Sequence, residues 1–297
     1  ILGLEQFGLK ENRKHIITTT IEHKAVLEPV AHLEEKGFEV TYLDVDESGL
    51  IDLDQFKAAL RADTLLVSIM HVNNETGCMQ PLPEICEVLN DSDAYFHVDA
   101  AQSFAKLTEG LVNDRIDFIS ASGHKVYAPK GVGALIMRKR GFTRPPLTPI
   151  FFGGGQEKGL RPGTLAVPLI AGFGLACEIA LKEHLAWQKH SQNLKTKLIE
   201  QLTPLDIVLN GDNSSPFVLN FTIPSINSEA AMVRLKGVVA VFNGSACTSN
   251  SYKPSHVLSA MGLDEDRING AIRMSWSHMT EELPLEQLVL TLNQLKL

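Results

Sequence analysis

The sequence is poor in cysteine and contains no long hydrophobic run. Only four of its 297 residues are cysteines, and no two of them form a CxxC pair. Closely spaced cysteines are typical of disulfide-rich proteins and structural zinc sites, so we expect neither a disulfide framework nor a metal site. No apolar stretch approaches membrane-spanning length, and the first residues lack the charged start and apolar centre of a signal peptide. These absences predict a cytoplasmic protein.

An excess of positive charge is missing as well. Lysine and arginine number 27 against 35 aspartates and glutamates, which gives a formal net charge of -8. Proteins that act mainly on nucleic acids or membrane surfaces need clustered Lys and Arg side chains. We therefore expect no direct nucleic-acid partner and no membrane partner, and instead a small molecule or another protein.

The first half of the chain alternates strand-like and helix-like segments with short connections. Strands are expected at residues 15–20, 38–43, 64–70, 94–98, 118–119 and 134–137, and helices at 25–36, 52–60 and 83–89. Repeated strand-helix-strand units form a mostly parallel sheet that helices cover on both faces. The pattern therefore predicts a large α/β domain over residues 1–182.

A long helix and a change in composition mark the second half. The helix is expected at residues 166–202, and beyond it Asn, Ser and Gly become frequent. Strands are expected at residues 217–223, 238–241 and 272–276, with helices at 257–261 and from Leu285 onward. We predict a smaller α+β C-terminal domain over residues 183–297.

Polar residues follow four strands of the predicted sheet. They are His23 and the segments 71–75, 99–102 and 122–125. In open α/β sheets the ligand binds at the carboxyl ends of the strands, where loops from several strands meet. These residues are therefore candidates for a common binding site.

Lys125 and Asp99 bear most directly on chemistry. Lys125 follows the strand at 118–119 among small and polar residues, where partial burial can lower the pKa of its amine and make it nucleophilic. A surface lysine before a Pro-Gly turn is the alternative. Asp99 ends an apolar strand, so its carboxylate needs a cationic partner unless it caps the following helix. Pyridoxal phosphate sites use such a lysine and aspartate, the aspartate keeping the ring nitrogen protonated.

Further polar residues could contact such a cofactor. His23 could stack on its ring and move protons, or could simply begin a helix. Candidates for hydrogen bonds to its phenolate oxygen or its phosphate are Asn74, Gln102, Ser122 and His124. The glycine-rich segment 153–164, which ends in Thr164, suits anion binding but could also be only a connector.

Cys247 and Arg273 are the two candidates in the second half. Cys247 lies in a polar segment, residues 243–251, with almost nothing to anchor it in a core. An exposed thiol is prone to oxidation, which favours a reactive role over inert packing. Arg273 lies inside an apolar strand, and its planar fork suits the carboxylate of an amino-acid substrate. A strand residue that faces solvent is the alternative.

Six segments together resemble the pyridoxal-phosphate-dependent cysteine desulfurases of the class V aminotransferase superfamily, most closely the NifS/IscS-like group. They follow the family's order and span nearly the whole chain, at residues 20–26, 68–77, 97–103, 120–133, 153–164 and 244–249. Such a set is far more specific than any one motif. The resemblance implies the fold-type I architecture, a mostly parallel sheet flanked by helices with a smaller α+β C-terminal domain, and pyridoxal 5'-phosphate as cofactor.

The resemblance also implies a role for each candidate residue. Lys125 forms the Schiff base with the cofactor, Asp99 pairs with its pyridine nitrogen, and His23 stacks on its ring. Contacts to the phenolate side are implied for Asn74 and Gln102, and contacts to the phosphate for Ser122, His124 and, across a homodimer, Thr164. Arg273 holds the substrate carboxylate, with Asn74 nearby, and Cys247 accepts the sulfur.

The activity that the resemblance implies is that of a homodimeric cysteine desulfurase. L-Cysteine becomes L-alanine, and its sulfur passes to Cys247 as a persulfide and then to a protein acceptor. Iron–sulfur cluster assembly, tRNA thiolation and DNA phosphorothioation are three open destinations. A class V aminotransferase or a selenocysteine lyase is the alternative enzyme, and the reactive segment around Cys247 argues against both.

The chain differs from the family at its beginning. It starts with Ile1, and it lacks the upstream Gly-Ala-Thr-Glu type of turn with which relatives hold the phosphate at a helix N-terminus. We therefore expect the N-terminal part of the large domain to be missing. A folded fragment that carries no cofactor and acts only by binding partners is the second alternative to a desulfurase.

Overall fold

The protein divides into two compact units. The computed structural model describes residues 1–212, 214–243 and 254–296. Unit 1 comprises Ile1–Leu43, Ile51–His71 and Gln80–Glu183, and unit 2 comprises Asp44–Leu50, Val72–Met79 and His184–Leu297. The last passage from unit 1 to unit 2 occurs within one long helix, α5 (Val167–Leu202). Each unit has its own sheet and its own hydrophobic core.

Unit 1 is built on a six-stranded sheet with the order β2-β1-β3-β4-β5-β6. The strands are β1 (His15–Thr19), β2 (Glu39–Leu43), β3 (Thr64–Met70), β4 (Tyr95–Asp99), β5 (Phe118–Ser122) and β6 (Gly133–Met137). All neighbours are parallel except β5 and β6, which are antiparallel. The predicted mostly parallel α/β sheet is therefore confirmed, with one antiparallel strand at its edge.

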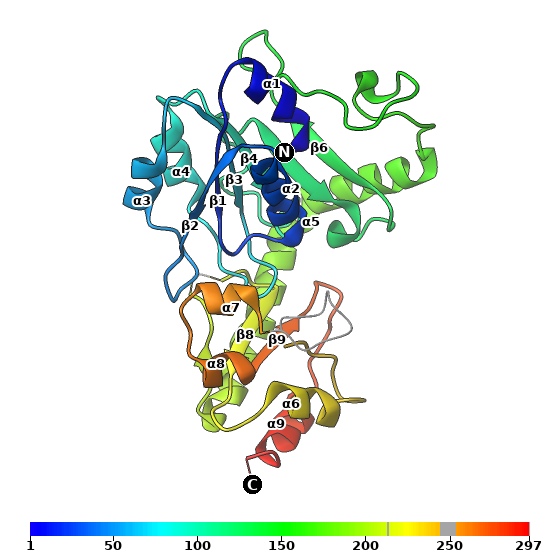
Figure 1. Ribbon diagram of the computed structural model, residues 1–297. Coiled ribbons are helices and arrows are strands. Elements are labelled where there is room, and N and C mark those ends of the chain that lie inside the picture. The colour runs from blue at the N-terminus through cyan, green and yellow to red at the C-terminus, as the bar shows by residue number, and fades with distance from the viewer. Residues whose placement is uncertain (213, 244–253, 297) are drawn as a thin grey trace. The chain divides into compact units, whose positions relative to one another are not determined.

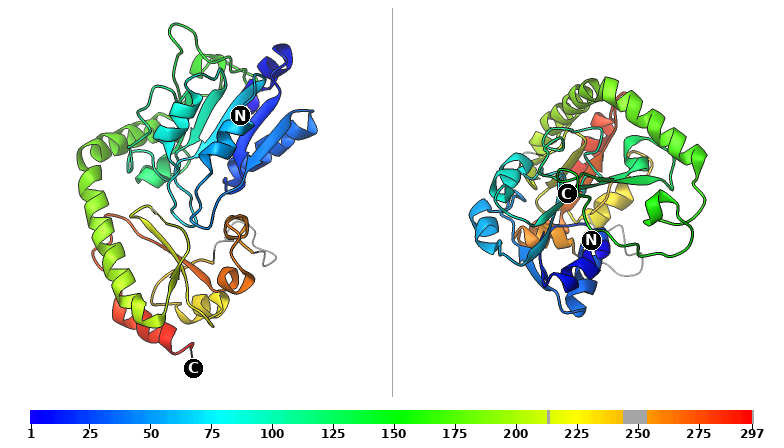
Figure 2. Two further views of the ribbon diagram at one scale, coloured as in Figure 1. Left: turned by 90° about the vertical axis from the view of Figure 1, so that its left-hand side faces the viewer. Right: turned by 90° about the horizontal axis from the view of Figure 1, so that it is seen from above.

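Helices cover both faces of this sheet. They include α1 (Glu5–Lys10), α2 (Lys24–Glu35), α3 (Leu53–Ala59) and α4 (Leu82–Leu89), with short 3-10 turns at η1 (Leu2–Leu4), η2 (Gly123–Val126) and η3 (Glu157–Gly159). The chain moves outward from β1 to β2 and then back across β1 to β3 and β4. Right-handed crossovers put α2 on one face and α3 and α4 on the other. Figure 1 shows this arrangement, and Figure 2 shows the same sheet from two further directions.

Sequence signals explain where several of these elements begin and what they bury. Asp52 begins α3 by accepting hydrogen bonds from the backbone N–H groups of Asp54 and Gln55 at 2.7 and 3.2 Å, which satisfies two donors of the first turn. In α2, Val26, Val30 and Leu33 are buried against the strands of unit 1. Their spacing of three and four residues gives one apolar face, which fixes α2 on the sheet.

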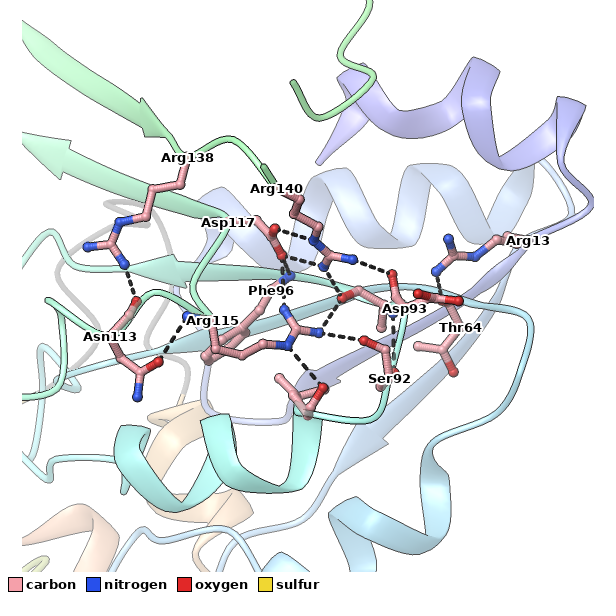
Figure 3. Close-up of polar contacts among 12 residues, drawn as sticks. Arg13, Thr64, Ser92, Asp93, Phe96, Asn113, Arg115, Asp117, Arg138 and Arg140 are labelled. Atoms are coloured by element: carbon pink, nitrogen blue, oxygen red, sulfur yellow. Dashed lines mark hydrogen bonds and ion pairs between the residues drawn. The ribbon is translucent and has the colours of Figure 1, made fainter. Parts of the chain in front are cut away.

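A buried carboxylate, Asp117, joins several segments at the amino-terminal end of the parallel strands of unit 1. Its Oδ1 accepts a hydrogen bond from Arg140 Nε at 2.7 Å, and its Oδ2 accepts bonds from Arg140 Nη2 at 2.8 Å, Arg115 Nη1 at 3.1 Å and the Phe96 N–H at 2.8 Å. The Arg140 guanidinium also lies 4.6 Å from the centre of the Tyr95 ring. Figure 3 shows Arg115 and Arg140 converging on this carboxylate. Asp117 thus links β4 to the segment before β5, which carries Arg115, and to the segment after β6, which carries Arg140.

Unit 2 contains a three-stranded antiparallel sheet with the order β7-β8-β9. Its strands are β7 (Val208–Leu209), β8 (Val218–Thr222) and β9 (Ala271–Ser275), and its helices are η4 (Thr203–Leu205), α6 (Ser228–Arg234), α7 (His256–Ala260), α8 (Glu265–Asn269) and α9 (Leu285–Asn293). The second half of α5 contributes Leu194, Leu198 and Leu202 to the core of this unit. No helix in the described ranges is both long and apolar enough to cross a membrane.

One predicted strand, residues 238–241, is wrong. These residues follow α6 as a turn and an irregular link, and Phe242 then forms an isolated antiparallel bridge with Arg273. Gly237, at a φ of 90°, turns the chain at the end of α6. Val239 and Val241 pack on the core of unit 2, so the apolar run reflects burial rather than strand pairing.

Candidate active site

The carboxyl ends of the parallel strands bring three predicted residues of unit 1, Asp99, His23 and Lys125, to the same edge of the sheet. Asp99 ends β4, where it lies beside Met70 of β3 and Ser120 of β5. His23 follows β1 and begins α2, because its Nδ1 accepts a hydrogen bond from the Ala25 N–H at 3.1 Å. β1 and β3 are also the strands between which the chain reverses its direction across the sheet, where α/β folds bind ligands.

The environment of Asp99 is suited to a positively charged ligand group. Burial raises the pKa of the half-buried Asp99 carboxyl, while its hydrogen bond from the Ala101 N–H and the charges of His23 and Lys125 act in the opposite direction. Asp99 ends β4 and Lys125 follows the neighbouring parallel strand β5, so both residues lie at the same edge of the sheet. Burial removes water from the Asp99 carboxylate and disfavours its charged form, and a cation bound beside it would stabilise that form.

Lys125 is presented by a tight turn directly after β5. It lies in η2, and Tyr127 ends this turn in the left-handed conformation with a φ of 66°. Gly123 is required there, because a Cβ atom would lie 2.7 Å from the carbonyl oxygen of Val132. Ser122 Oγ lies 3.1 Å from His124 Nδ1, so these two predicted phosphate ligands are joined to each other. The turn therefore carries an amine and two polar groups within four residues.

Gln102 and Thr164 are the remaining cofactor candidates of unit 1, and the structure gives fewer contacts for them than for Asp99 and Ser122. Gln102 is half-buried in the turn that follows Asp99. Thr164 is exposed in the irregular segment before α5, one residue after Gly163, whose N–H donates a hydrogen bond to Gln156 Oε1 at 3.1 Å. Gln102 belongs to the same strand-end region as Asp99, whereas Thr164 lies in a separate exposed segment of unit 1.

Two ionisable residues near this region were not predicted. Glu22 has no exposed surface, and its Oε1 accepts hydrogen bonds from Thr19 Oγ1 at 3.0 Å and from the Met70 N–H at 2.7 Å. Burial raises its pKa to about 8. Lys106 is 6% exposed, and burial followed by the charge of Lys125 lowers its pKa to about 8. The position of Glu22 directly before His23 was the one available signal.

Unit 2 brings together the two residues predicted to hold the substrate. Arg273 Nη1 donates a hydrogen bond to the carbonyl oxygen of Asn74 at 3.1 Å. The turn that carries Asn74 is held by Asn73 Oδ1, which accepts hydrogen bonds from the N–H groups of Glu75 at 2.8 Å and Thr76 at 3.1 Å. Burial raises the pKa of Glu75, while its hydrogen bond from Ser255 and the charges of His256 and Arg273 act in the opposite direction.

The predicted nucleophile Cys247 lies outside the described residues. The other three cysteines are free thiols. Cys78 and Cys86 are buried, and burial raises the pKa of each to about 11, whereas Cys177 is half-buried on α5. High pKa values and burial both suppress thiol reactivity, so Cys78 and Cys86 are packing residues.

The residues of unit 1 fit pyridoxal 5'-phosphate. A half-buried carboxylate suits its pyridinium nitrogen, the Lys125 amine suits its aldehyde, and the Ser122 and His124 pair suits its phosphate. Within the part of the chain that the structure describes, no group of three His, Cys, Asp or Glu side chains is placed to hold a metal ion.

Comparison with known proteins points to one family. The family model for aminotransferase class-V matches residues 1–288. A mitochondrial cysteine desulfurase of Candida maltosa is 42% identical across 99% of this chain, and this chain spans 61% of its length. The crystal structure of DndA from Streptomyces lividans has 46% identity and a TM-score of 0.83, with 93% of this chain and 78% of that chain covered. The structure of SspA in complex with cysteine has 38% identity and a TM-score of 0.76, covering 92% and 77%.

Proposed function

We propose that this chain, which belongs to the aminotransferase class-V family, is a pyridoxal-phosphate-dependent cysteine desulfurase. It would convert L-cysteine to L-alanine and transfer the sulfur to Cys247. The observation that carries the proposal is the strand-end region of unit 1, where a half-buried Asp99 lies within electrostatic reach of both Lys125 and His23. The curated relatives at 42–44% identity are cysteine desulfurases, and the related SspA structure holds cysteine.

The residues of unit 1 would hold the cofactor. When bound, pyridoxal 5'-phosphate withdraws electrons from the substrate carbon skeleton, which is the chemistry that no protein side chain supplies. Asp99 would keep a proton on the ring nitrogen, and Lys125 would provide the amine that bonds the cofactor to the chain. His23 would stack on the ring and move protons, and Gln102 would hydrogen-bond its phenolate side.

The phosphate would be held by polar groups near the Lys125 turn. Ser122 and His124 already share a hydrogen bond of 3.1 Å, so their side chains are oriented toward a common point. Thr164 would reach the phosphate of the partner subunit in a homodimer.

The sulfur transfer would use Cys247 as the nucleophile. Its thiolate attacks the sulfur of L-cysteine and forms an S–S bond, while the Cβ–S bond of the substrate breaks and its electron pair stays on the carbon skeleton. Protonation of that carbon completes L-alanine, and Cys247 is left as a persulfide. Arg273 and Asn74 would hold the substrate carboxylate during this step, because a guanidinium matches a carboxylate with two parallel hydrogen bonds.

The partners of this reaction are a second copy of the chain and a protein that accepts sulfur. A homodimer is supported by apolar side chains that unit 1 exposes on α5, among them Val167 at 65%, Leu175 at 58% and Leu181 at 76% exposure. The acceptor would take the persulfide sulfur for iron–sulfur assembly, tRNA thiolation or DNA phosphorothioation. We place this activity in the cytoplasm, although the curated relatives include mitochondrial enzymes.

The proposal is tested by measuring alanine and sulfide from the pyridoxal-phosphate-loaded chain with L-cysteine and a thiol reductant. We expect equal amounts of both products, and a loss of at least about a hundredfold in Cys247→Ala. Cys177→Ala, which removes a half-buried thiol from α5, is the matched control and should keep the wild-type rate. An unaffected Cys247→Ala enzyme would favour a selenocysteine lyase, and consumption of L-cysteine without release of alanine and sulfide would favour an aminotransferase. A chain that takes up no cofactor would favour a partner-binding fragment.

A further inference from the structure

Phe242 packs its ring on the guanidinium of Arg273. The carbon at the centre of the guanidinium lies 5.0 Å from the centre of the Phe242 ring. The two backbones are also paired, because the Arg273 N–H donates to the Phe242 carbonyl at 2.6 Å and the Phe242 N–H donates to the Arg273 carbonyl at 3.1 Å. Ring and guanidinium are therefore held together by both main chain and side chain.

The exposure of Phe242 indicates that it is not a core residue. Val241, directly before it, is 6% exposed and belongs to the hydrophobic core of unit 2, whereas Phe242 is 40% exposed. A large aromatic side chain that stays this open while contacting a charged group is better explained by that contact than by apolar burial. The bridge to β9 fixes the backbone of Phe242, so its ring starts from a position beside Arg273 and only a rotation about its side-chain torsions could move it away.

Two contacts of different kinds help to orient the Arg273 head group. The ring of Phe242 lies against the guanidinium, and the carbonyl oxygen of Asn74 accepts a hydrogen bond from Nη1 at 3.1 Å. A free arginine side chain loses rotamer entropy when it binds a carboxylate, and a head group that is already oriented loses less. The ring also removes water from beside the cation, which strengthens a hydrogen-bonded ion pair.

We propose that Phe242 is a positioning residue for the substrate carboxylate, which acts by holding the Arg273 guanidinium in its binding orientation. The ligand class is an α-amino acid with a free α-carboxylate, and analogues whose carboxylate is neutralised should not depend on Phe242. This inference rests on the proposed function, in which Arg273 binds that carboxylate. It assigns Phe242 to recognition of the carboxylate and not to the chemical step.

The test compares L-alanine with L-alaninamide, in which the carboxylate is a neutral amide. Their Kd values are measured by calorimetry on the pyridoxal-phosphate-loaded protein. Phe242→Leu keeps an apolar side chain but removes the aromatic face, and should weaken L-alanine binding about three- to tenfold while leaving L-alaninamide unchanged. Phe242→Tyr keeps the face and should stay within about twofold of the wild type. Phe142→Leu, at a fully exposed phenylalanine of unit 1, is the matched control and should change neither value.

Arg273→Lys separates this proposal from the proposed function. Loss of L-alanine binding in Arg273→Lys, with no further loss in the Phe242→Leu, Arg273→Lys double variant, supports both. If Arg273→Lys weakens L-alanine and Phe242→Leu does not, the role of Phe242 is overturned alone. If Arg273→Lys leaves L-alanine binding unchanged, the carboxylate assignment and the role of Phe242 fail together. A Phe242→Leu protein that melts earlier but keeps its L-alanine affinity would show a purely structural residue.

Discussion

Glu22 has no exposed surface, yet it neighbours a residue proposed to stack on the cofactor. Its carboxyl accepts hydrogen bonds from Thr19 of β1 and from the Met70 N–H of β3, so it joins the ends of the two parallel strands between which the order of the strands along the chain reverses. Burial raises its pKa from 4.5 to about 8, with the charge of Asp99 acting in the same direction. A neutral Glu22 leaves Asp99 as the negative charge that the cofactor would meet.

Glu22→Gln tests the protonation state of Glu22. Because the folded pKa is raised, the folded state binds this proton more tightly than the unfolded state, and the free energy of unfolding falls as the pH rises from about 4.5 to about 8. Between pH 5 and pH 7 this loss is about 3 kcal/mol in the wild type and absent from Glu22→Gln. Urea unfolding at several pH values measures both. Parallel stability curves for the two proteins would contradict this assignment.

At the residue scale, the sequence indicates a candidate site residue when its chemical type and its position after a strand are both informative. The positions of Lys125, Asp99 and His23 beyond apolar strands could be predicted from the sequence, whereas their roles toward the cofactor stay predictions. Glu22 and Lys106 could not, because their importance depends on burial that only the folded chain reveals. The role proposed for Phe242 could not be predicted either, since an aromatic residue in an apolar run predicts a core position.

At the scale of elements, Asp117 is the charge that holds the strands of unit 1 at the end opposite the candidate site. Arg115 and Arg140 both bond to its carboxylate, and both donate to the carbonyl oxygen of Ala94, each at 2.7 Å. The side chain of Asp117 is only 4% exposed. Two arginines left without this carboxylate would be partly buried cations.

Asp117→Asn should therefore lower the free energy of unfolding by about 3 kcal/mol or more, because it breaks a buried ion pair on one side only. Thermal and urea unfolding measure the loss. Asp206→Asn is the control, since Asp206 pairs with Lys296 at 3.2 Å but its side chain is 84% exposed, and its loss should stay below about 1 kcal/mol. Equal losses in the two variants would show that the Asp117 cluster is no stronger than a surface pair.

Most elements of unit 1 were predictable, because apolar runs and helix caps are local signals. The strand 64–70 matches β3 in full, and the Asp52 cap begins α3. The antiparallel direction of β6 could not be predicted, since hydrophobic periodicity carries no strand direction. The place of residues 72–79 in unit 2 depends on distant contacts, such as the hydrogen bond of 3.1 Å from Asn220 Nδ2 to the Glu75 carbonyl.

At the scale of the whole molecule, the exposed apolar side chains of α5 predict that a second copy of the chain packs on this helix. Leu181→Glu places a charge where a second copy would bury a leucine, and should convert a dimer into a monomer of half the mass. Sedimentation velocity of the loaded protein measures the change. The control is Lys182→Glu on the same helix, whose side chain is 68% exposed and which should leave the mass unchanged. A wild-type protein that sediments as a monomer would refute the homodimer.

The buried thiols of Cys78 and Cys86 can report the unfolding of the two units separately. Cys78 belongs to unit 2 and Cys86 to unit 1, at 0% and 2% exposure, although they lie close together in the sequence. An alkylating reagent reacts only with an exposed and deprotonated thiol. Each cysteine would thus be labelled when its own unit unfolds, and tandem mass spectrometry of labelled protein would time the two events separately without any substitution.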